Sequence, residues 1–216
     1  MKIVIKVGGS VSIGPTGPNF SYFSRLLPVL RRVKEKNQLI VAIGGGKLTR
    51  EYYKSIEKFE ISDSDKEKIF LELIKANVRF LSTLLKMKPL FDLDKISKNT
   101  RGVIGGIKPG RSTDANAAIA ARKIKADLFI KLTNVDGVHD KDPNKFKKTR
   151  KIDKMNFSDL RKITKKGGPN NYGILDATAI RVLSGSKTKT VIIDGKDPEN
   201  ILRVLSGKKI GTIISE

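Results

Sequence analysis

Three glycine-rich segments hold the residues of this sequence that could do chemistry. They read KVGGS at 6–10, IGGGK at 43–47 and GGIKPGRSTD at 105–114. Each one follows a run of apolar, β-branched residues and precedes a run whose apolar residues have helical spacing. A backbone without Cβ atoms lets N–H groups approach phosphate oxygens closely, and the start of a helix adds partial positive charge. Together the three segments indicate a site that binds phosphate groups where strands end.

The first segment also supplies a cation, because Lys6 stands just before the Gly8–Gly9 pair. An ammonium group there could stabilise the charge that spreads over the oxygens of a phosphoryl group during transfer. The segments contain no Ser–His–Asp arrangement, which disfavours hydrolase chemistry. Phosphoryl transfer by positioning and electrostatics fits these residues better.

Other nucleotide and metal motifs are incomplete or absent in this sequence. A Walker A loop would need Ser or Thr after Gly46 and Lys47, where Leu48 stands, and no G-x-G-x-x-G follows the first strand. The segment that starts at Asp140 resembles a calcium loop at first, but Lys145 stands where that loop requires glycine. Neither a P-loop nor an EF-hand is therefore expected.

Composition limits the partners of the chain. The net charge of +22 comes from 44 Lys and Arg against 22 Asp and Glu, and it would attract polyanions without regard to their sequence. The lysines are spread along the whole chain, and only 6% of residues are aromatic, with no Trp to stack on bases. We therefore expect nucleic acid to bind only non-specifically. A nucleic-acid-binding or regulatory protein remains an alternative interpretation.

The rarest residue types exclude further classes of site. The chain has no cysteine, which excludes disulfides and thiolate metal sites. Its one histidine, His139, excludes sites built from several histidines, and a lone histidine is more often a surface residue than a catalyst. No apolar run approaches the length of a membrane span, and the first residues lack the apolar core of a signal peptide. These observations predict a cytoplasmic protein without a membrane partner.

The elements that must position the glycine segments alternate between strand and helix. We expect Pro28 to bend or interrupt the first helix. The alternation predicts an α/β protein with a mostly parallel sheet that is covered on both faces and binds ligands at the carboxyl ends of its strands. The expected strands cover 2–7, 38–47, 102–106, 126–138 including a polar turn, 189–195 and 211–216, and the expected helices cover 19–36, 48–59, 64–87, a stretch from about 113, 156–167, 175–186 and 197–207.

The helix expected at 64–87 is the longest and has a strong apolar stripe. Its apolar residues recur at spacings of three and four, from Ile69 to Leu84. Such a stripe packs against the protein core or against a second subunit, and the pattern alone leaves both interpretations open.

Four of these segments, in this order, resemble the amino acid kinase superfamily, and most closely its archaeal-type uridylate kinases: KVGGS, GGGK, PGRSTDANAA and TNVDGVHDKDP. The resemblance covers nearly the whole chain. It implies a three-layer αβα sandwich with a central, mainly parallel sheet, built as one compact unit. In this family, residues 1–125 would form the half that binds the acceptor UMP, and residues 126–216 the half that binds ATP. Relatives of this kind usually assemble into homo-oligomers, most often hexamers.

The resemblance further implies an enzyme of pyrimidine biosynthesis that transfers the γ-phosphoryl group of ATP to UMP. Mg²⁺ would enter with the ATP phosphates and would not be held by protein side chains alone. The residues that match the family motifs take three roles. The catalytic ones would be Lys6, Asp114 and Arg181; those at ATP would be Gly9, Ser10, Gly46, Arg50, Thr133, Asn134, His139 and Asp142; those at UMP would be Gly45, Glu67, Ile107, Lys108, Pro109, Gly110, Arg111, Ser112 and Thr113.

The sequence departs from the family pattern at three of these positions. Glu67 stands where relatives usually have Asp at the UMP ribose, and His139 stands where a Tyr often stacks near the adenine. Arg181 replaces a Lys, but its guanidinium keeps the charge and can bind phosphate. A sister kinase that acts on another phosphate or carboxylate, such as isopentenyl phosphate, is a second alternative. Such a phosphate acceptor usually goes with a catalytic histidine in the early glycine region, which this chain lacks.

Overall fold

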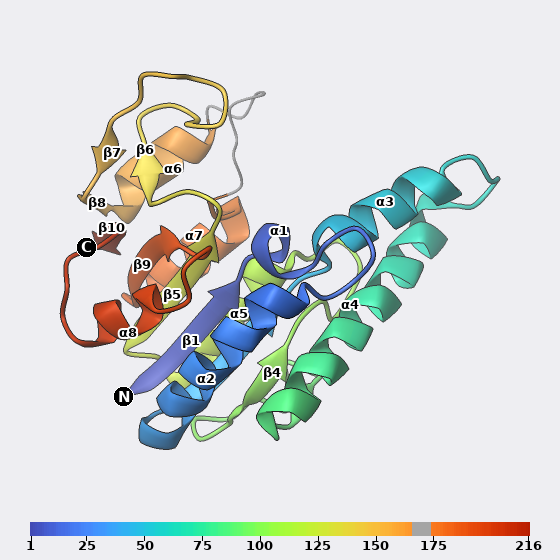
Figure 1. The fold of residues 1–216 in the computed structure, drawn as a ribbon, viewed down its shortest axis with the longest axis horizontal. Helices are drawn as coiled ribbons and strands as arrows, with labels where there is room; N and C mark the ends of the chain where they lie inside the picture. Colours follow the sequence, from blue (N-terminus) through green and yellow to red (C-terminus); the bar gives the residue numbers. More distant parts are fainter. Residues whose placement is uncertain (166–173) are drawn as a thin grey trace.

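One main sheet runs through the molecule (Figure 1), and the glycine segments follow the carboxyl ends of its strands. The computed structural model describes residues 1–165 and 174–216. Within them, eight strands form the sheet in the spatial order β3 (Pro89–Leu90), β4 (Gly102–Ile104), β2 (Gln38–Ile43), β1 (Lys2–Val7), β5 (Leu128–Thr133), β9 (Lys189–Asp194), β10 (Thr212–Ser215) and β8 (Lys154–Asn156).

The central strands are hidden from solvent along almost their whole length. Five of the six residues of β1, five of the six of β2 and all six of β5 are buried. A parallel strand that is covered on both faces needs a continuous apolar run, and the β-branched residues of these segments provide it. Pairing fixes the register, which places Lys6 of β1 beside both Ala42 of β2 and Lys131 of β5.

Helices cover both faces of the sheet and complete a three-layer sandwich. One face packs on α5 (Thr113–Ile124), α6 (Phe157–Lys165) and α7 (Ala177–Gly185), and the other packs on α2 (Phe20–Lys36), α4 (Asp63–Leu85) and α8 (Asn200–Leu205). Each face has its own apolar cluster, formed by alternate side chains of the strands. The expected α/β architecture with a mainly parallel sheet is confirmed.

Local signals account for several helix boundaries. Ser62, Ser112 and Asp176 each precede a helix, and their side chains accept backbone N–H groups at the starts of α4, α5 and α7. The expected effect of Pro28 was wrong in part, because α2 continues through it from Phe20 to Lys36 without interruption.

Three features of the fold differ from the expectation. The strand expected at 126–138 ends at Thr133, and Val138–His139 forms a separate strand, β6, which pairs with β7 (Lys151–Ile152) in a small hairpin. The closing strand β10 runs antiparallel to β9. Short elements also escaped the prediction, because four residues or fewer show no clear period: α1 (Gly9–Ser12), β3 and β8.

The second half of the chain joins the first without a break in the sheet. β1 and β5, which stand on either side of the expected boundary near residue 125, pair directly in the middle of the sheet. The end of the helix expected at 156–167 lies outside the described residues, since α6 is described to Lys165. In the described part of the chain, none of the helices has the length and apolar character needed to span a membrane.

Candidate active site

A pocket of about 410 Å³ lies at the carboxyl ends of β1, β2 and β5, where the glycine segments meet. The start of α5 and the start of α3 (Gly46–Ile56) close two of its sides. The residues that line it are Lys6, Gly8, Gly9, Ser10, Gly44, Gly45, Gly46, Thr49, Arg50, Ser112, Thr113, Asp114, Lys131, Leu132, Thr133 and Asn134. Ligands of parallel sheets bind at the carboxyl ends of the strands, and the glycine segments predict a site at the same place.

Two lysines share one carboxylate at the floor of the pocket. Lys131 Nζ donates a hydrogen bond to Asp114 Oδ2, and Lys6 Nζ lies 3.6 Å from Asp114 Oδ1. Lys6 Nζ also donates to the carbonyl oxygen of Val7 at 3.0 Å. The two lysines are about 5% exposed, although lysine is almost never buried without a partner. The fold therefore places two ammonium groups side by side beneath the glycine segments.

Burial and mutual charge shift the ionisation of this cluster. Burial lowers the pKa of Lys6 to about 8; the carboxylate of Asp114 opposes this shift and the ammonium group of Lys131 adds to it. Burial by itself would raise the pKa of Asp114, but the ammonium groups of Lys131 and Lys6 outweigh it and hold that pKa below its usual value. At neutral pH the cluster consists of two cations and one anion, which favours an anionic ligand.

The backbones of the glycine segments pack too closely for side chains. A Cβ atom on Gly8 would lie 2.5 Å from the carbonyl oxygen of Leu132, and one on Gly9 would lie 2.7 Å from Gly46. Gly46 also has a φ of +66°, in the left-handed region that favours glycine. Glycine is needed here because the loops after β1 and β2 contact each other directly at the pocket.

Lys131 is the functional candidate that the sequence reasoning missed. It lies in β5, in the run LFIKLT, where every neighbouring side chain is buried. A charged residue inside a strand with two covered faces was the signal that could have identified it. Its partner became visible only in the folded chain, because Asp114 is 17 residues away in sequence.

The residues expected at UMP form two groups, one that lines the pocket and one that lies outside it. Gly45, Ser112 and Thr113 line the pocket. Glu67, on α4, lies beside the loop before α5, and its Oε2 accepts the N–H of Gly110 at 3.0 Å. The rest of that loop stands outside the pocket, with Lys108 and Pro109 exposed and Ile107 and Arg111 half-buried. Gly110 has a φ of +70°, and the Ser112 hydroxyl donates to Asp176.

Most residues expected at ATP line the same pocket: Gly9, Ser10, Gly46, Arg50, Thr133 and Asn134. Asp142 and His139 do not line it. Asp142 is buried, and its Oδ1 accepts the backbone N–H and the side-chain amide of Asn144, at 2.9 and 3.0 Å. These contacts indicate that Asp142 shapes the loop after β6.

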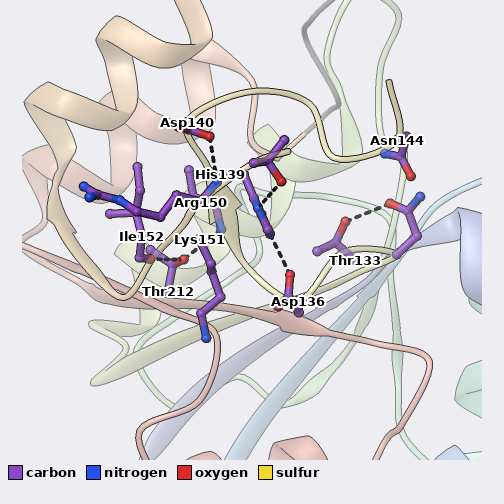
Figure 2. A network of polar contacts seen from close by, with 12 residues as sticks. Thr133, Asp136, His139, Asp140, Asn144, Arg150, Lys151, Ile152 and Thr212 are labelled. Carbon is purple, nitrogen blue, oxygen red and sulfur yellow. Dashed lines mark hydrogen bonds and ion pairs between the residues drawn. The ribbon is translucent and has the colours of Figure 1, made fainter. Parts of the chain in front are cut away.

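His139 is buried at 8% exposure, which corrects the expectation of a surface histidine. Figure 2 shows its ring pointing toward Asp136, and Nε2 lies 2.7 Å from Asp136 Oδ1. On the other side of the ring, Nδ1 lies 2.9 Å from Thr149 Oγ1. The neighbouring residue Asp140 accepts the N–H of Arg150 at 2.9 Å. The ring thus links the segment before β6 to the segment before β7.

Arg181, expected among the catalytic residues, lies on α7 with its side chain exposed, outside the residues that line the pocket. Within residues 1–165 and 174–216, no three His, Cys, Asp or Glu side chains gather into a group that could hold a metal ion. Asp114 is the single carboxylate among the lining residues, and two ammonium groups already contact it.

A larger hollow of about 560 Å³ lies at the opposite edge of the sheet, beside the amino ends of β1, β5 and β9. Lysines and apolar side chains line it, among them Lys189, Lys208 and Val191, and it includes none of the residues expected at ATP or UMP. The pocket at the carboxyl ends is the better candidate because it contains the converging glycine loops and the buried charges.

Comparisons with known proteins agree with this geometry. Residues 1–98 and 95–194 match the model of the amino acid kinase family. The chain is 33% identical over 227 residues to uridylate kinase of Thermococcus kodakarensis, with 99% of both chains covered. It is 34% identical over 226 residues to that of Archaeoglobus fulgidus, with 100% of both covered.

Solved structures extend the comparison to three dimensions. The crystal structure of uridylate kinase from Archaeoglobus fulgidus matches with a TM-score of 0.85, 32% identity and 100% of both chains covered. The UMP kinase structure from Bacillus anthracis matches with a TM-score of 0.81 over 99% of this chain and 95% of that one; at 19% identity it supports the fold alone. From the family match and these full-length relatives, we conclude that the chain belongs to the amino acid kinase family.

Proposed function

We propose that this protein is an ATP-dependent kinase that transfers the γ-phosphoryl group to UMP and produces UDP and ADP. The observation that carries the proposal is the Lys6–Asp114–Lys131 cluster beneath three converging glycine loops. This arrangement can hold phosphate groups of two ligands end to end and stabilise charge between them. The identity of the acceptor is supported by the relatives, which match over their full length and are uridylate kinases.

In this proposal UMP occupies the side of the pocket between α3, α4 and the start of α5. The backbone of Gly45 and the hydroxyl of Thr113 would contact its phosphate, since both line the pocket. Glu67 and the loop at 107–113 would enclose the nucleoside. The hydrogen bond between Glu67 and Gly110 supports this, because it shows that the side chain of Glu67 reaches this loop. Glu67 could exchange this contact for the ribose hydroxyls, for which a carboxylate is a suitable acceptor.

ATP would occupy the side formed by the loop after β1 and the end of β5. The N–H groups of Gly9 and Ser10 would contact the phosphates at the start of α1, together with Gly46 and the guanidinium of Arg50. Thr133 and Asn134 would line the path toward the nucleoside. We assign His139 and Asp142 to stabilising the loop around β6, beside which the adenine would bind, because both make hydrogen bonds within the β6–β7 hairpin region.

The chain's own contribution to transfer would be electrostatic. Lys6 and Lys131 would donate to the oxygens of the moving phosphoryl group, and Asp114 would keep both ammonium groups in position. The acceptor phosphate is already largely ionised at neutral pH, so the chain needs no strong base. Arg181 is exposed and would have to move to act on the phosphates.

Mg²⁺ fits this pocket as an ion that arrives with ATP. Asp114 is a single carboxylate, and Mg²⁺ commonly combines one or two carboxylates with substrate phosphates and water. Asp114 would be its protein contact or would orient it. When bound, the ion supplies neutralisation of the charge on the β- and γ-phosphates.

An ADP-release assay with several acceptors tests the proposal. UMP should support rapid ADP formation at saturating MgATP, with weaker activity on CMP and dUMP and none above background on isopentenyl phosphate. Preference for isopentenyl phosphate would identify a sister kinase. Absence of turnover with all four, combined with salt-dependent RNA binding, would support the nucleic-acid-binding alternative.

We place the protein in the cytoplasm, where both nucleotides are available, and expect its contacts with nucleic acid to be non-specific.

We further propose that the protein forms a homo-oligomer, as a hexamer, through the first half of α4 and the neighbouring α3. The second half of α4 packs on the core through Val78, Leu81 and Leu85, whereas Ile69 and Leu73 in its first half are only half-buried. Figure 1 shows α3 and this part of α4 extending beyond the sheet. Tyr52 on α3 adds a large side chain that is 43% exposed.

Light scattering at micromolar concentration should therefore give a mass several times that of the 23.9 kDa chain. Leu73→Glu should lower the mass, because a carboxylate would be buried in the interface. Phe20→Glu is the matched control: Phe20 is 86% exposed at the start of α2, outside the proposed interface, and its replacement should not change the mass. A monomer in the unmodified protein would contradict the proposal.

A further inference from the structure

A buried asparagine in α4 contacts the backbone of the phosphate pocket. Asn77 is 4% exposed and lies next to Val78, which is fully buried against the sheet. Its Nδ2 donates a hydrogen bond to the carbonyl oxygen of Gly44, at 3.1 Å. Burial of an amide is unfavourable unless it is hydrogen-bonded, so a polar residue on this apolar face is best explained by the bond that it makes.

Gly44, which accepts this bond, is part of the pocket. It follows β2 directly and is one of the lining residues. A Cβ atom on Gly44 would lie 3.2 Å from Thr113 Oγ1 and 3.7 Å from Lys6 Nζ. The backbone that Asn77 contacts is thus a direct neighbour of the proposed catalytic cation.

The bond to Gly44 also fixes the direction of the next N–H group. In a trans peptide the C=O of one residue and the N–H of the following residue point in opposite directions. The Gly44 carbonyl points toward α4, so the Gly45 N–H points away from it. Since α5 lies on the opposite face of the sheet, this direction leads toward the side where Thr113 and Asp114 line the pocket. Among the described residues, none accepts a hydrogen bond from the Gly45 N–H.

We propose that Asn77 is a positioning residue that orients the Gly44–Gly45 peptide so that the Gly45 N–H donates to the acceptor phosphate. This inference rests on the proposed function for the identity of that phosphate. Asn77 does not contact the ligand and acts through the peptide group. Without it, the peptide could rotate and place the carbonyl oxygen, a partial negative charge, toward the phosphate.

The kinetic test compares Asn77→Leu, which removes the donor but keeps the number and branching of the side-chain heavy atoms, with Asn37→Leu. Asn37 also donates through Nδ2 to a backbone carbonyl, that of Val33 at 3.0 Å, but at the end of α2 and away from the pocket. Asn77→Leu should lower kcat/KM for UMP by about tenfold or more, as misplaced catalytic groups do, while KM for ATP changes by less than about threefold. Asn37→Leu should leave both constants unchanged. An unchanged kcat/KM for UMP in folded Asn77→Leu would overturn the inference.

The second test uses the ¹⁵N–¹H NMR signal of the Gly45 amide, which reports the hydrogen bond directly. In the unmodified protein this signal should move strongly when inorganic phosphate or UMP is added, and in Asn77→Leu the movement should fall to less than half. If the unmodified protein fails to phosphorylate UMP, the proposed function is wrong, yet the response to inorganic phosphate still tests the role of Asn77. Equal movement in both proteins would refute that role. Should Asn77→Leu not fold, Asn77→Ser, whose shorter hydroxyl does not reach the carbonyl, replaces it.

Discussion

Replacing Lys6 by alanine is expected to lower kcat for UDP formation by about a hundredfold or more. The Lys6 ammonium group is buried at the floor of the pocket, 3.6 Å from Asp114, and it borders the place where the two glycine loops meet. Charge on a transferring phosphoryl group would develop beside this buried ammonium group. The loss should therefore appear in kcat and in kcat/KM alike, as for a donor that acts mainly in the transition state. Steady-state kinetics with MgATP varied from below KM to saturation, at saturating UMP, measures both constants.

Lys47→Ala is the matched control, because Lys47 is an exposed lysine that follows the same glycine loops and does not line the pocket. Its kcat should stay within about twofold of the unmodified protein, as for most surface substitutions. The pH profile gives an independent check. Since burial lowers the pKa of Lys6 to about 8, kcat/KM for ATP should fall as the pH rises above that value and Lys6 loses its charge. In Lys6→Arg this decrease should disappear from the measurable range. Near-normal turnover of Lys6→Ala would remove Lys6 from the mechanism.

Asp114→Asn is expected to produce the second large effect, a decrease in kcat of about a hundredfold at pH 7.5. The substitution preserves the shape of the side chain but removes the charge that Lys6 and Lys131 share. Two buried ammonium groups would then face each other without a carboxylate between them. Because Asp114 counteracts the downward shift of the Lys6 pKa, its loss should lower that pKa further below 8. Part of the Lys6 population would be neutral at physiological pH.

The pH dependence separates this explanation from simple damage to the fold. The decrease of kcat/KM at high pH should begin at a lower pH in Asp114→Asn than in the unmodified protein, and activity should recover in part as the pH is lowered. Asp94→Asn serves as the control; Asp94 pairs with Lys123 at 3.5 Å but is 98% exposed, so that pair contributes little. If Asp114→Asn lost activity equally at every pH, its charge would not act through Lys6.

Much of the fold followed from local patterns. The apolar, β-branched runs of β1, β2 and β5 and the periodic run of α4 are local in sequence, and each was placed to within a few residues. The glycine segments also indicated the pocket, since the carboxyl ends of neighbouring parallel strands meet at one edge of the sheet. Lys6, Thr113 and Asp114 could be placed there because they adjoin these segments.

Other features depended on contacts between residues that are distant in the sequence, so local patterns could not show which residues act together. Lys131 becomes a site residue only because β5 pairs with β1 in the register that places it beside Lys6. The burial of His139 depends on Thr149, whose hydroxyl contacts the imidazole ring although it is ten residues further along the chain. The presence of a single histidine in a sequence does not show whether its side chain is buried and hydrogen-bonded or exposed to solvent.

What the sequence determined by itself was the type of each element and the presence of phosphate-binding loops, because backbone propensity and glycine are properties of single segments. The tertiary structure alone decided which charges act together. Strand register placed Lys6 and Lys131 side by side, and the start of α5 supplied Asp114 between them. Packing of α4 placed the amide of Asn77 on the carbonyl of Gly44. Electrostatic and hydrogen-bond energies depend on distances of a few ångströms across the fold, and those distances are fixed only when the chain has packed.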